Sequence, residues 1–234
     1  MAEIPASRQR SSQGDDVRRF FSAFAAQWDS LYGGRRNVFW RAFDHAFRRD
    51  VSERYQLTFE QLDMDLTGTT VLDIGCGSGI YCLEAVRRGA ARVVGIDIAD
   101  DMIALARERC AQEGRGDVCE FVIGEFPPKR AIPHLSMTCD YAIVMGVMDY
   151  VPDANAFVAA LRPLVRRSAI ISFPGRHWLR GPLRQYRYRA LGRCAVYNYD
   201  QASVVAACTG AGFRKVQVKR LPHSGICYIV SAQV

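Results

Sequence analysis

The stretch that decides the fold is VLDIGCGSGIYCLEAVRRGAARVVGIDIAD, residues 71–100. It begins with a short aliphatic run that ends at alternating glycines, which predicts a buried strand followed by a tight turn. The next segment, IYCLEAVRRG, predicts a helix that stops at Gly89, and ARVVGIDI predicts a second strand. Strand, glycine turn, helix and strand together predict a parallel βαβ unit of the kind that binds nucleotides.

The same alternation continues toward the C-terminus. Further helices are expected at 99–114, 152–162 and 201–212, and further strands at 117–126, 139–147, 168–173, 213–221 and 226–234. The last two strands are separated only by the short segment PHSG, which favours an antiparallel hairpin. We therefore expect an α/β fold with a doubly wound, seven-stranded, mainly parallel sheet, an antiparallel C-terminal hairpin and an N-terminal helical cap.

The domain organisation follows from the change of pattern along the chain. Residues 1–15 are polar and predict a mobile tail, whereas residues 16–65 carry aromatic residues at helical spacing and predict a helical cap, with Asp16 as the N-cap. Residues 66–234 form the sheet domain, with a second cap segment inserted at about 174–199.

The glycine turn, Gly75-Cys76-Gly77-Ser78-Gly79, has the spacing G-x-G-x-G. A dinucleotide-binding turn prefers G-x-G-x-x-G, and its third glycine would stand at position 80, which is Ile80 here. Asp73 lies at the end of the strand, where a carboxylate would repel a phosphate and attract an ammonium group. The pattern predicts a ligand that carries an amine and no pyrophosphate.

Two further acidic residues extend the predicted site. Asp97 ends the second strand, where a carboxylate accepts hydrogen bonds from both hydroxyls of a ribose. Glu125 ends the third strand beside Phe126, and the pair would hold an adenine by its polar edge and its face. An amine, a ribose and a purine without phosphate are the parts of S-adenosylmethionine.

Residues 68–172 resemble the class I S-adenosylmethionine-dependent methyltransferases, whose fold is Rossmann-like. VLDIGCGSG resembles the first motif of that family, VVGIDIADDMIALARER the second, and CDYAIVMGVMDYVPD the fourth strand. The resemblance implies that Asp73 and the Gly75–Gly77 backbone hold the methionine part, and that Ile98 and Met102 flank the adenine. The predicted cofactor-binding residues are Asp73, Gly75, Cys76, Gly77, Asp97, Ile98, Met102, Glu125, Phe126 and Gly146.

The acceptor side is expected where the fourth and fifth strands end. The segment MGVMDYVPD is neither the Asn/Asp-Pro-Pro-Tyr sequence nor the Pro-Cys nucleophile of enzymes that methylate nucleic-acid bases. Asp149 and Tyr150 are the candidate catalytic residues, although Asp149 would equally order the turn before Pro152.

Substrate-binding or lid residues are expected in both cap segments. They are Trp28, Tyr32, His177, Tyr197 and Asn198. For the aromatic residues of the first cap, core packing is the alternative, and for His177 it is a surface position.

The composition bears on three kinds of partner, namely nucleic acids, metal ions and membranes. The net charge is +7 and only three of the 31 basic residues are Lys, yet the Arg residues are spread over several segments, which argues against a nucleic-acid partner. The eight cysteines include no C-x-x-C pair, so no metal site is expected. No apolar run is long enough to span a membrane and no signal-peptide pattern is present, so we expect a cytoplasmic protein.

Four functions fit the predicted site. The first is methyl transfer to a small-molecule acceptor. The second makes S-adenosylmethionine the substrate, with its amine attacking its own Cγ to give azetidine-2-carboxylate and methylthioadenosine. The third is methylation of RNA, favoured by the Arg content, and the fourth is a non-catalytic binding subunit. The sequence leaves the acceptor, the need for a general base and the oligomeric state open.

Overall fold

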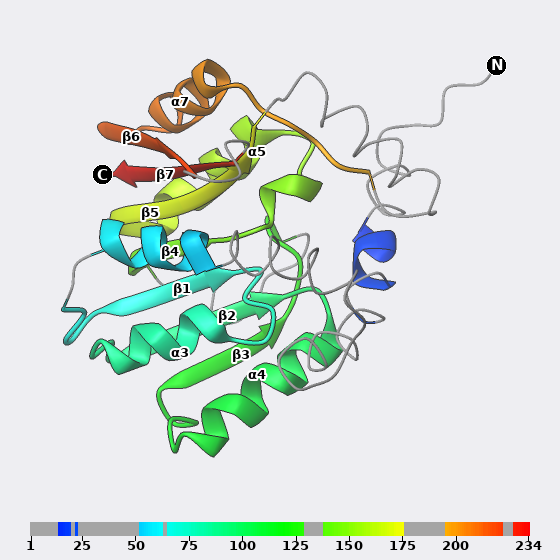
Figure 1. Cartoon of the computed structure of the whole chain (residues 1–234), viewed down its shortest axis with the longest axis vertical. Coiled ribbons are helices and arrows are strands. Elements are labelled where there is room, and N and C mark those ends of the chain that lie inside the picture. Colours follow the sequence, from blue (N-terminus) through cyan, green and yellow to red (C-terminus); the bar gives the residue numbers. More distant parts are fainter. Residues whose placement is uncertain are drawn as a thin grey trace, which may run out of the picture.

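A computed structural model describes residues 14–19, 22, 52–62, 65–128, 138–175, 195–221 and 227–234. Within this part of the chain, a seven-stranded sheet has the strand order β3-β2-β1-β4-β5-β7-β6 (Figure 1). Its strands are β1 (Thr70–Ile74), β2 (Arg92–Asp97), β3 (Cys119–Ile123), β4 (Cys139–Val144), β5 (Val165–Pro174), β6 (Lys215–Arg220) and β7 (Cys227–Gln233). The first five strands pair in parallel, whereas β7 runs antiparallel between β5 and β6. The predicted fold class is confirmed.

Helices cover both faces of the sheet (Figure 1). They are α3 (Ile80–Arg87), α4 (Asp100–Gln112), α5 (Ala154–Leu161) and α7 (Gln201–Gly210), with short 3-10 turns η1 (Met148–Tyr150) and η2 (Arg162–Leu164). α3 and α4 pack on one face together with a helix at residues 52–61, and α5 and α7 pack on the other. None of the described helices combines the length and the apolar character needed to cross a membrane.

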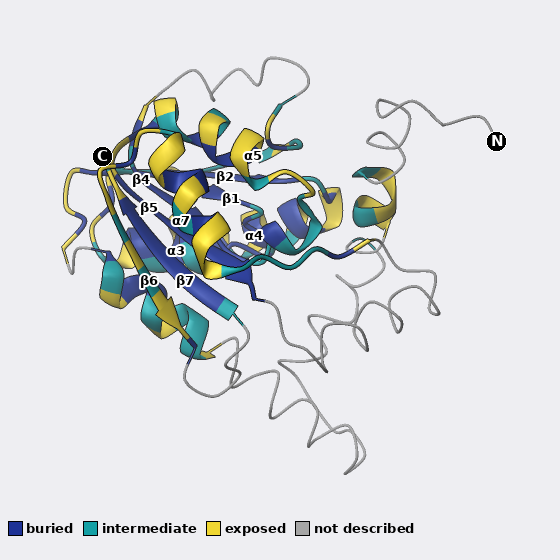
Figure 2. Ribbon diagram, turned by 90° about the horizontal axis from the view of Figure 1, so that it is seen from above, coloured by how far each residue is buried: buried dark blue, intermediate teal, exposed yellow. Residues whose placement is uncertain are grey.

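The core consists of two apolar layers that alternate along each strand, because successive side chains of a strand point to opposite faces. In β1, Val71 belongs to the layer under α3 and α4, whereas Leu72 and Ile74 belong to the layer under α5 and α7. The same alternation places Asp73 on the α3 face. Figure 2 shows the buried strands enclosed by helices whose outer surfaces are exposed.

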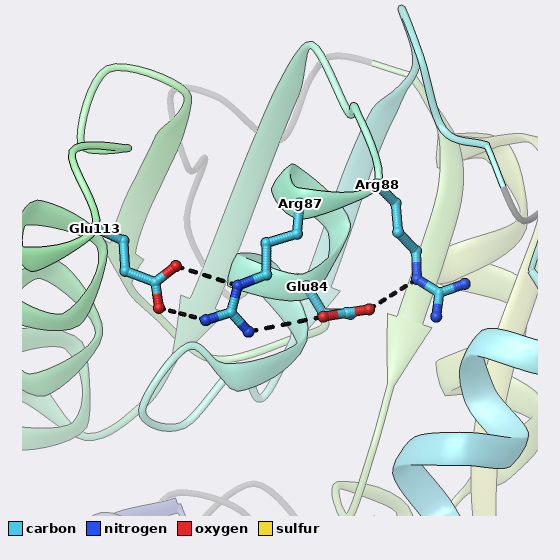
Figure 3. Close-up of polar contacts among 4 residues, drawn as sticks. All are labelled: Glu84, Arg87, Arg88 and Glu113. Carbon is cyan, nitrogen blue, oxygen red and sulfur yellow. Dashed lines mark hydrogen bonds and ion pairs between the residues drawn. The ribbon is translucent and has the colours of Figure 1, made fainter.

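The C-terminal ends of α3 and α4 are joined by charged side chains (Figure 3). Arg87 pairs with Glu113 of the turn after α4, and Arg88 donates to Glu84 over 2.9 Å. These pairs are partly exposed, so each contributes at most about 1 kcal/mol to stability. They lie at the opposite end of α3 from the glycine turn, where the pair of Arg87 and Glu113 links the C-terminal end of α3 to that of α4.

The sheet determines where a ligand binds. β1 has β2 on one side and β4 on the other, so the direction in which the sheet grows reverses between β1 and β4. Ligands of open α/β sheets bind beyond the carboxyl ends of the strands at such a reversal. In Figure 1 the helix at residues 14–19 also lies at this edge of the sheet.

Some element boundaries differ from the prediction. The third strand ends at Ile123, so Glu125 follows the strand instead of ending it. The first described helix already includes Gly14, so Asp16 lies inside it and its carboxylate pairs with Arg19 at 2.6 Å instead of capping the helix. β5 begins at Val165, three residues before the predicted start.

Parts of the predicted caps lie outside the described residues. Trp28, Tyr32 and His177 are among them, as is most of the segment from 16 to 65. Of the insertion at about 174–199, the structure describes Pro174, Gly175 and residues 195–199.

Candidate functional site

The three alternating glycines of the turn after β1 adopt backbone conformations with positive φ. Gly75, Gly77 and Gly79 have φ angles of 71°, 52° and 77°, in the left-handed region that side chains disfavour. A Cβ on Gly75 would also lie 2.2 Å from Cγ2 of Val147, the residue that follows Gly146 at the end of β4. The G-x-G-x-G spacing is therefore the spacing of the left-handed positions, and the turn packs directly against the end of β4.

Four N–H groups of this turn, those of Gly75, Cys76, Gly77 and Gly79, have acceptors within the protein. Those of Gly75 and Cys76 donate to the carbonyl of Ile96 over 2.7 and 3.0 Å. That of Gly77 donates to Oδ2 of Asp97 over 2.8 Å. Phosphate-binding turns instead aim several free N–H groups at the anion. The geometry agrees with the sequence-based exclusion of a phosphate.

Asp73 is the most unusual acidic group of the site. Its side chain is only 1% exposed, and its Oδ2 accepts a hydrogen bond from the Cys82 thiol over 3.2 Å. Its Oδ1 is buried and has no hydrogen-bond partner among the described residues. Burial, with a smaller contribution from the charge of nearby Asp97, raises the pKa of Asp73 to about 7, although the hydrogen bond from Cys82 lowers it. A buried oxygen of this kind fits a cationic ligand group, such as the ammonium of S-adenosylmethionine.

Asp97 fastens the turn to β2. Its Oδ1 accepts from the N–H of Ala99 over 2.9 Å and its Oδ2 from that of Gly77 over 2.8 Å. Burial raises its pKa, and these backbone donors oppose the increase. A carboxylate oxygen can accept two hydrogen bonds, so each oxygen retains capacity for a ribose hydroxyl. The predicted role fits this geometry.

Sequence inspection missed Arg54, on the helix at residues 52–61. Thr58 of the same helix donates to the carbonyl of Arg54 over 2.7 Å and to Sδ of Met145 over 3.4 Å, which holds the helix against the end of β4. A Cβ on Gly146 would lie 3.4 Å from Nη1 of Arg54. The guanidinium group therefore lies beside Gly146, a predicted cofactor-binding residue. No motif marked it, because it precedes β1 in an otherwise ordinary amphipathic helix.

The predicted adenine end is bordered by the first described helix. Arg18 donates through Nε to the carbonyl of Ile98 over 2.9 Å. A Cβ on Gly14 would lie 3.4 Å from Oε1 of Glu125, so the same helix also passes close to that carboxylate. Met102, the other residue predicted to flank the adenine, is 3% exposed at the start of α4.

Phe126 does not lie as the prediction requires. Its ring is 9% exposed and packs edge-on against Phe157 of α5, with 5.0 Å between the ring centroids. It belongs to the apolar layer under α5 and α7. The strand ends at Ile123, and the chain then turns Phe126 into the core, which argues against a ring stacked on adenine.

On the acceptor side, residues 195–200 bring together two of the predicted positions. The N–H of Tyr197 donates to the carbonyl of Asp149 in η1 over 2.8 Å. The hydroxyl of Tyr199 donates to the carbonyl of Val151, and its N–H to that of Pro174 over 2.8 Å. Asp149 and Tyr150 therefore share one end of the sheet with Tyr197 and Asn198.

A neighbouring acidic residue caps the helix after Pro152. The side chain of Asp153 accepts from the N–H of Ala156 over 3.0 Å and caps α5. Asp149 contributes its backbone carbonyl to the contact with Tyr197, and its side chain lies one turn earlier, in η1. No group of three or more His, Cys, Asp or Glu side chains within the described ranges is placed to hold a metal ion.

Comparison with known proteins agrees with this geometry. Residues 71–168 match the family described as "Methyltransferase domain". Residues 71–168 therefore carry a domain of this methyltransferase family. This family uses S-adenosylmethionine, so the family and the cofactor predicted from sequence are both confirmed.

Several relatives share this methyltransferase domain. The chain is 38% identical over 109 residues to a ubiquinone biosynthesis O-methyltransferase of Neisseria meningitidis, a match that covers 47% of the chain and 44% of the relative. It is 42% identical over 85 residues to the ribosomal protein L11 methyltransferase of Vibrio cholerae, covering 36% and 29%. The chain thus spans less than half the length of the curated relatives it matches.

Among solved structures, a magnesium protoporphyrin IX methyltransferase from Synechocystis with bound S-adenosylhomocysteine has a similar fold. The TM-score is 0.69 at 21% identity, and the match covers 94% of this chain and 99% of that one. At this identity the similarity concerns the fold.

Proposed function

We propose that the protein transfers the methyl group of S-adenosylmethionine to a small-molecule acceptor. The observation that carries this proposal is the pair of buried carboxylates around a turn in which the N–H groups of Gly75, Cys76, Gly77 and Gly79 have acceptors within the protein. Asp73 presents an unpartnered oxygen to a cation, and Asp97 retains acceptor capacity for a ribose. A nucleoside that carries an amino-acid group and no phosphate matches this arrangement better than a phosphorylated nucleotide.

In the proposed binding mode, three side chains each contact a different group of the ligand. Asp73 pairs with its ammonium group and Asp97 with its ribose hydroxyls. Arg54, whose Nη1 lies beside Gly146, is proposed to pair with its carboxylate. When bound, S-adenosylmethionine supplies an activated methyl group on its sulfonium sulfur.

The acceptor is proposed to enter beside η1. Asp149 and Tyr150 lie at the end of β4, and the backbone contact with Tyr197 brings residues 195–200 over them. There, Asp149 would take a proton from a hydroxyl acceptor, and Tyr150, Tyr197 and Asn198 would orient it. These side chains suit a compact polar acceptor group.

The named relatives support a small-molecule acceptor. One is a ubiquinone biosynthesis O-methyltransferase, and a structural neighbour methylates magnesium protoporphyrin IX. Another relative is a ribosomal protein L11 methyltransferase, whose match covers only 85 residues and 29% of that relative. The cysteines of the described part of the chain form no disulfide, which fits the proposed cytoplasmic location.

Product analysis tests the proposal. The full chain is incubated with S-adenosylmethionine alone and with catechol or carboxylate acceptors, and the nucleoside products are separated by chromatography. We expect S-adenosylhomocysteine to form at an enzymatic rate only when an acceptor is present. Methylthioadenosine formed without an acceptor would contradict methyl transfer and identify S-adenosylmethionine as the substrate of a cyclisation.

A further inference from the structure

A buried thiol contacts the acidic group at the end of β1. Cys82 lies in the first turn of α3, is 0% exposed, and donates its S–H to Oδ2 of Asp73 over 3.2 Å. The contact follows from the fold, because the alternation of β1 places Asp73 on the face that α3 covers. Cys82 lies between the two sequence motifs that resemble the methyltransferase family, so no role for it was predicted from sequence.

The groups around Asp73 show why the hydrogen bond donated by the Cys82 thiol affects the charge state of this carboxylate. Asp97 approaches from β2 with a like charge, and the thiols of Cys76 and Cys82 approach from the glycine turn and from α3. Arg54 lies farther along, beside Gly146 at the end of β4. Burial raises the pKa of Asp73 to about 7, and the hydrogen bond from Cys82 opposes that increase.

The thiol is suited to this task because it stays protonated. Burial and the neighbouring Cys76 and Asp73 raise the pKa of Cys82 well above its ordinary value, so it remains a donor through the physiological range. A neutral S–H is a weak donor. It can therefore orient one carboxylate oxygen without neutralising the group, and it leaves Oδ1 available.

We propose that Cys82 is a positioning residue for Asp73: its thiol holds one carboxylate oxygen, directs the other to the ammonium group of the ligand, and sets the pH below which that group is no longer bound. The inference rests on the proposed function and adds a control of ligand affinity by protons.

The proton dependence has a definite sign. The ammonium group pairs with ionised Asp73, so a protonated Asp73 must lose its proton before the ligand binds. Affinity is then highest above the pKa of about 7 and falls by about tenfold per pH unit well below it. Removing the thiol donor raises the pKa of Asp73 and moves this fall to higher pH, whereas a stronger donor moves it to lower pH.

Calorimetric titration of the full chain tests the proposal. S-adenosylhomocysteine, which carries the ammonium group, and methylthioadenosine, which lacks the amino-acid part, are each titrated between pH 5.5 and 8. We expect the wild type to lose affinity for S-adenosylhomocysteine at low pH and to bind methylthioadenosine with little change over the same range.

Two substitutions at the same position separate positioning from packing. Cys82→Ala removes the donor, and we expect the midpoint of the pH dependence to rise by about one pH unit. Cys82→Ser keeps a stronger donor, and we expect the midpoint to fall. A purely structural role would move both variants in the same direction, because both reduce the volume of the side chain.

Cys208→Ala is the matched control, because Cys208 is also 0% exposed on a helix but belongs to the apolar layer under α5 and α7. We expect it to keep the wild-type pH dependence. Equal midpoints in wild type, Cys82→Ala and Cys82→Ser would overturn the role of Cys82 while leaving the proposed function intact. A wild type that binds neither nucleoside would overturn the proposed function itself.

Discussion

We expect Asp73→Asn to abolish binding of S-adenosylhomocysteine and, at pH 8, to make the ligand-free protein more stable than the wild type. Both effects have one cause. The pKa of Asp73 is raised from 3.8 to about 7 in the folded chain, so the folded state holds its proton more tightly than the unfolded state. Stability from this group is fully present below about pH 4 and is lost as the pH rises to about 7. At pH 8 the ionised carboxylate costs up to about 4 kcal/mol, since three pKa units correspond to that free energy.

The asparagine side chain keeps the shape of Asp73 and carries no charge to bury. The variant therefore avoids the cost of ionisation, and it also loses the charge that pairs with the ammonium group of the ligand. Thermal unfolding at pH 5 and pH 8, followed by circular dichroism, measures the first effect. We expect the melting temperature of the variant to exceed that of the wild type by several °C at pH 8, with a smaller difference at pH 5.

Calorimetry at pH 7.5 measures the second effect on the same preparations. A variant that binds S-adenosylhomocysteine with wild-type affinity would show that Asp73 is not the ammonium partner. A variant that melts below the wild type at pH 8 would show that the buried carboxylate is compensated by contacts beyond Cys82.

Gly75→Ala has the second large expected effect. A Cβ at this position would lie 2.2 Å from Cγ2 of Val147, and the backbone has a φ of 71°. The turn must move away from the end of β4, which separates Asp73 from the residues beside Gly146. We expect affinity for S-adenosylhomocysteine to fall at least 100-fold and the free energy of unfolding to fall by about 2 to 4 kcal/mol.

Gly114→Ala is the matched control for the backbone. Gly114 has a φ of 66°, and a Cβ there meets no described heavy atom within 4 Å. It lies in the exposed turn after α4, at the opposite end of that helix from Asp97. We expect this variant to lose about 1 to 2 kcal/mol of stability and to bind the ligand normally.

Chemical denaturation and calorimetry distinguish the two glycine variants. The account fails if Gly75→Ala binds as tightly as Gly114→Ala, because the contact with Val147 would then have no consequence for the site.

The fold could be predicted from sequence because its signals are local and repeated. Each strand of the parallel sheet is a short apolar run, and the glycine stops of α3 and α4, Gly89 and Gly114, stand directly in the sequence. The exact residues at which the strands end were predicted less accurately. Glu125 was assigned to the end of the third strand, but β3 stops at Ile123. Strand ends depend on pairing with neighbours, which a single segment does not reveal.

The positions of the two acidic residues assigned to the cofactor were predictable for a related reason. Asp73 lies one residue before the end of β1 and Asp97 is the last residue of β2, and parallel strands place their carboxyl ends along one edge. The position of Phe126 was not predictable in the same way. Beside Glu125 it has the composition of an adenine contact, but the turn of the chain after β3 directs its ring onto Phe157.

The residues that were missed depend on contacts between distant segments. Arg54 reaches Gly146 only because its helix packs against the end of β4 through Thr58 and Met145. Cys82 acquires its role only because α3 folds back over the strand that holds Asp73. Neither residue type is unusual in a helix, so tertiary structure was needed to connect them with the site.

The central claim is that this turn selects a cationic, phosphate-free nucleoside through Asp73 and Asp97. Competition calorimetry with the full chain at pH 7.5 tests it most directly, with S-adenosylhomocysteine, ATP and NAD as the ligands. We predict that S-adenosylhomocysteine binds at one site per chain and that neither ATP nor NAD displaces it at comparable concentration. Binding of ATP or NAD that equals or exceeds that of S-adenosylhomocysteine would contradict the account.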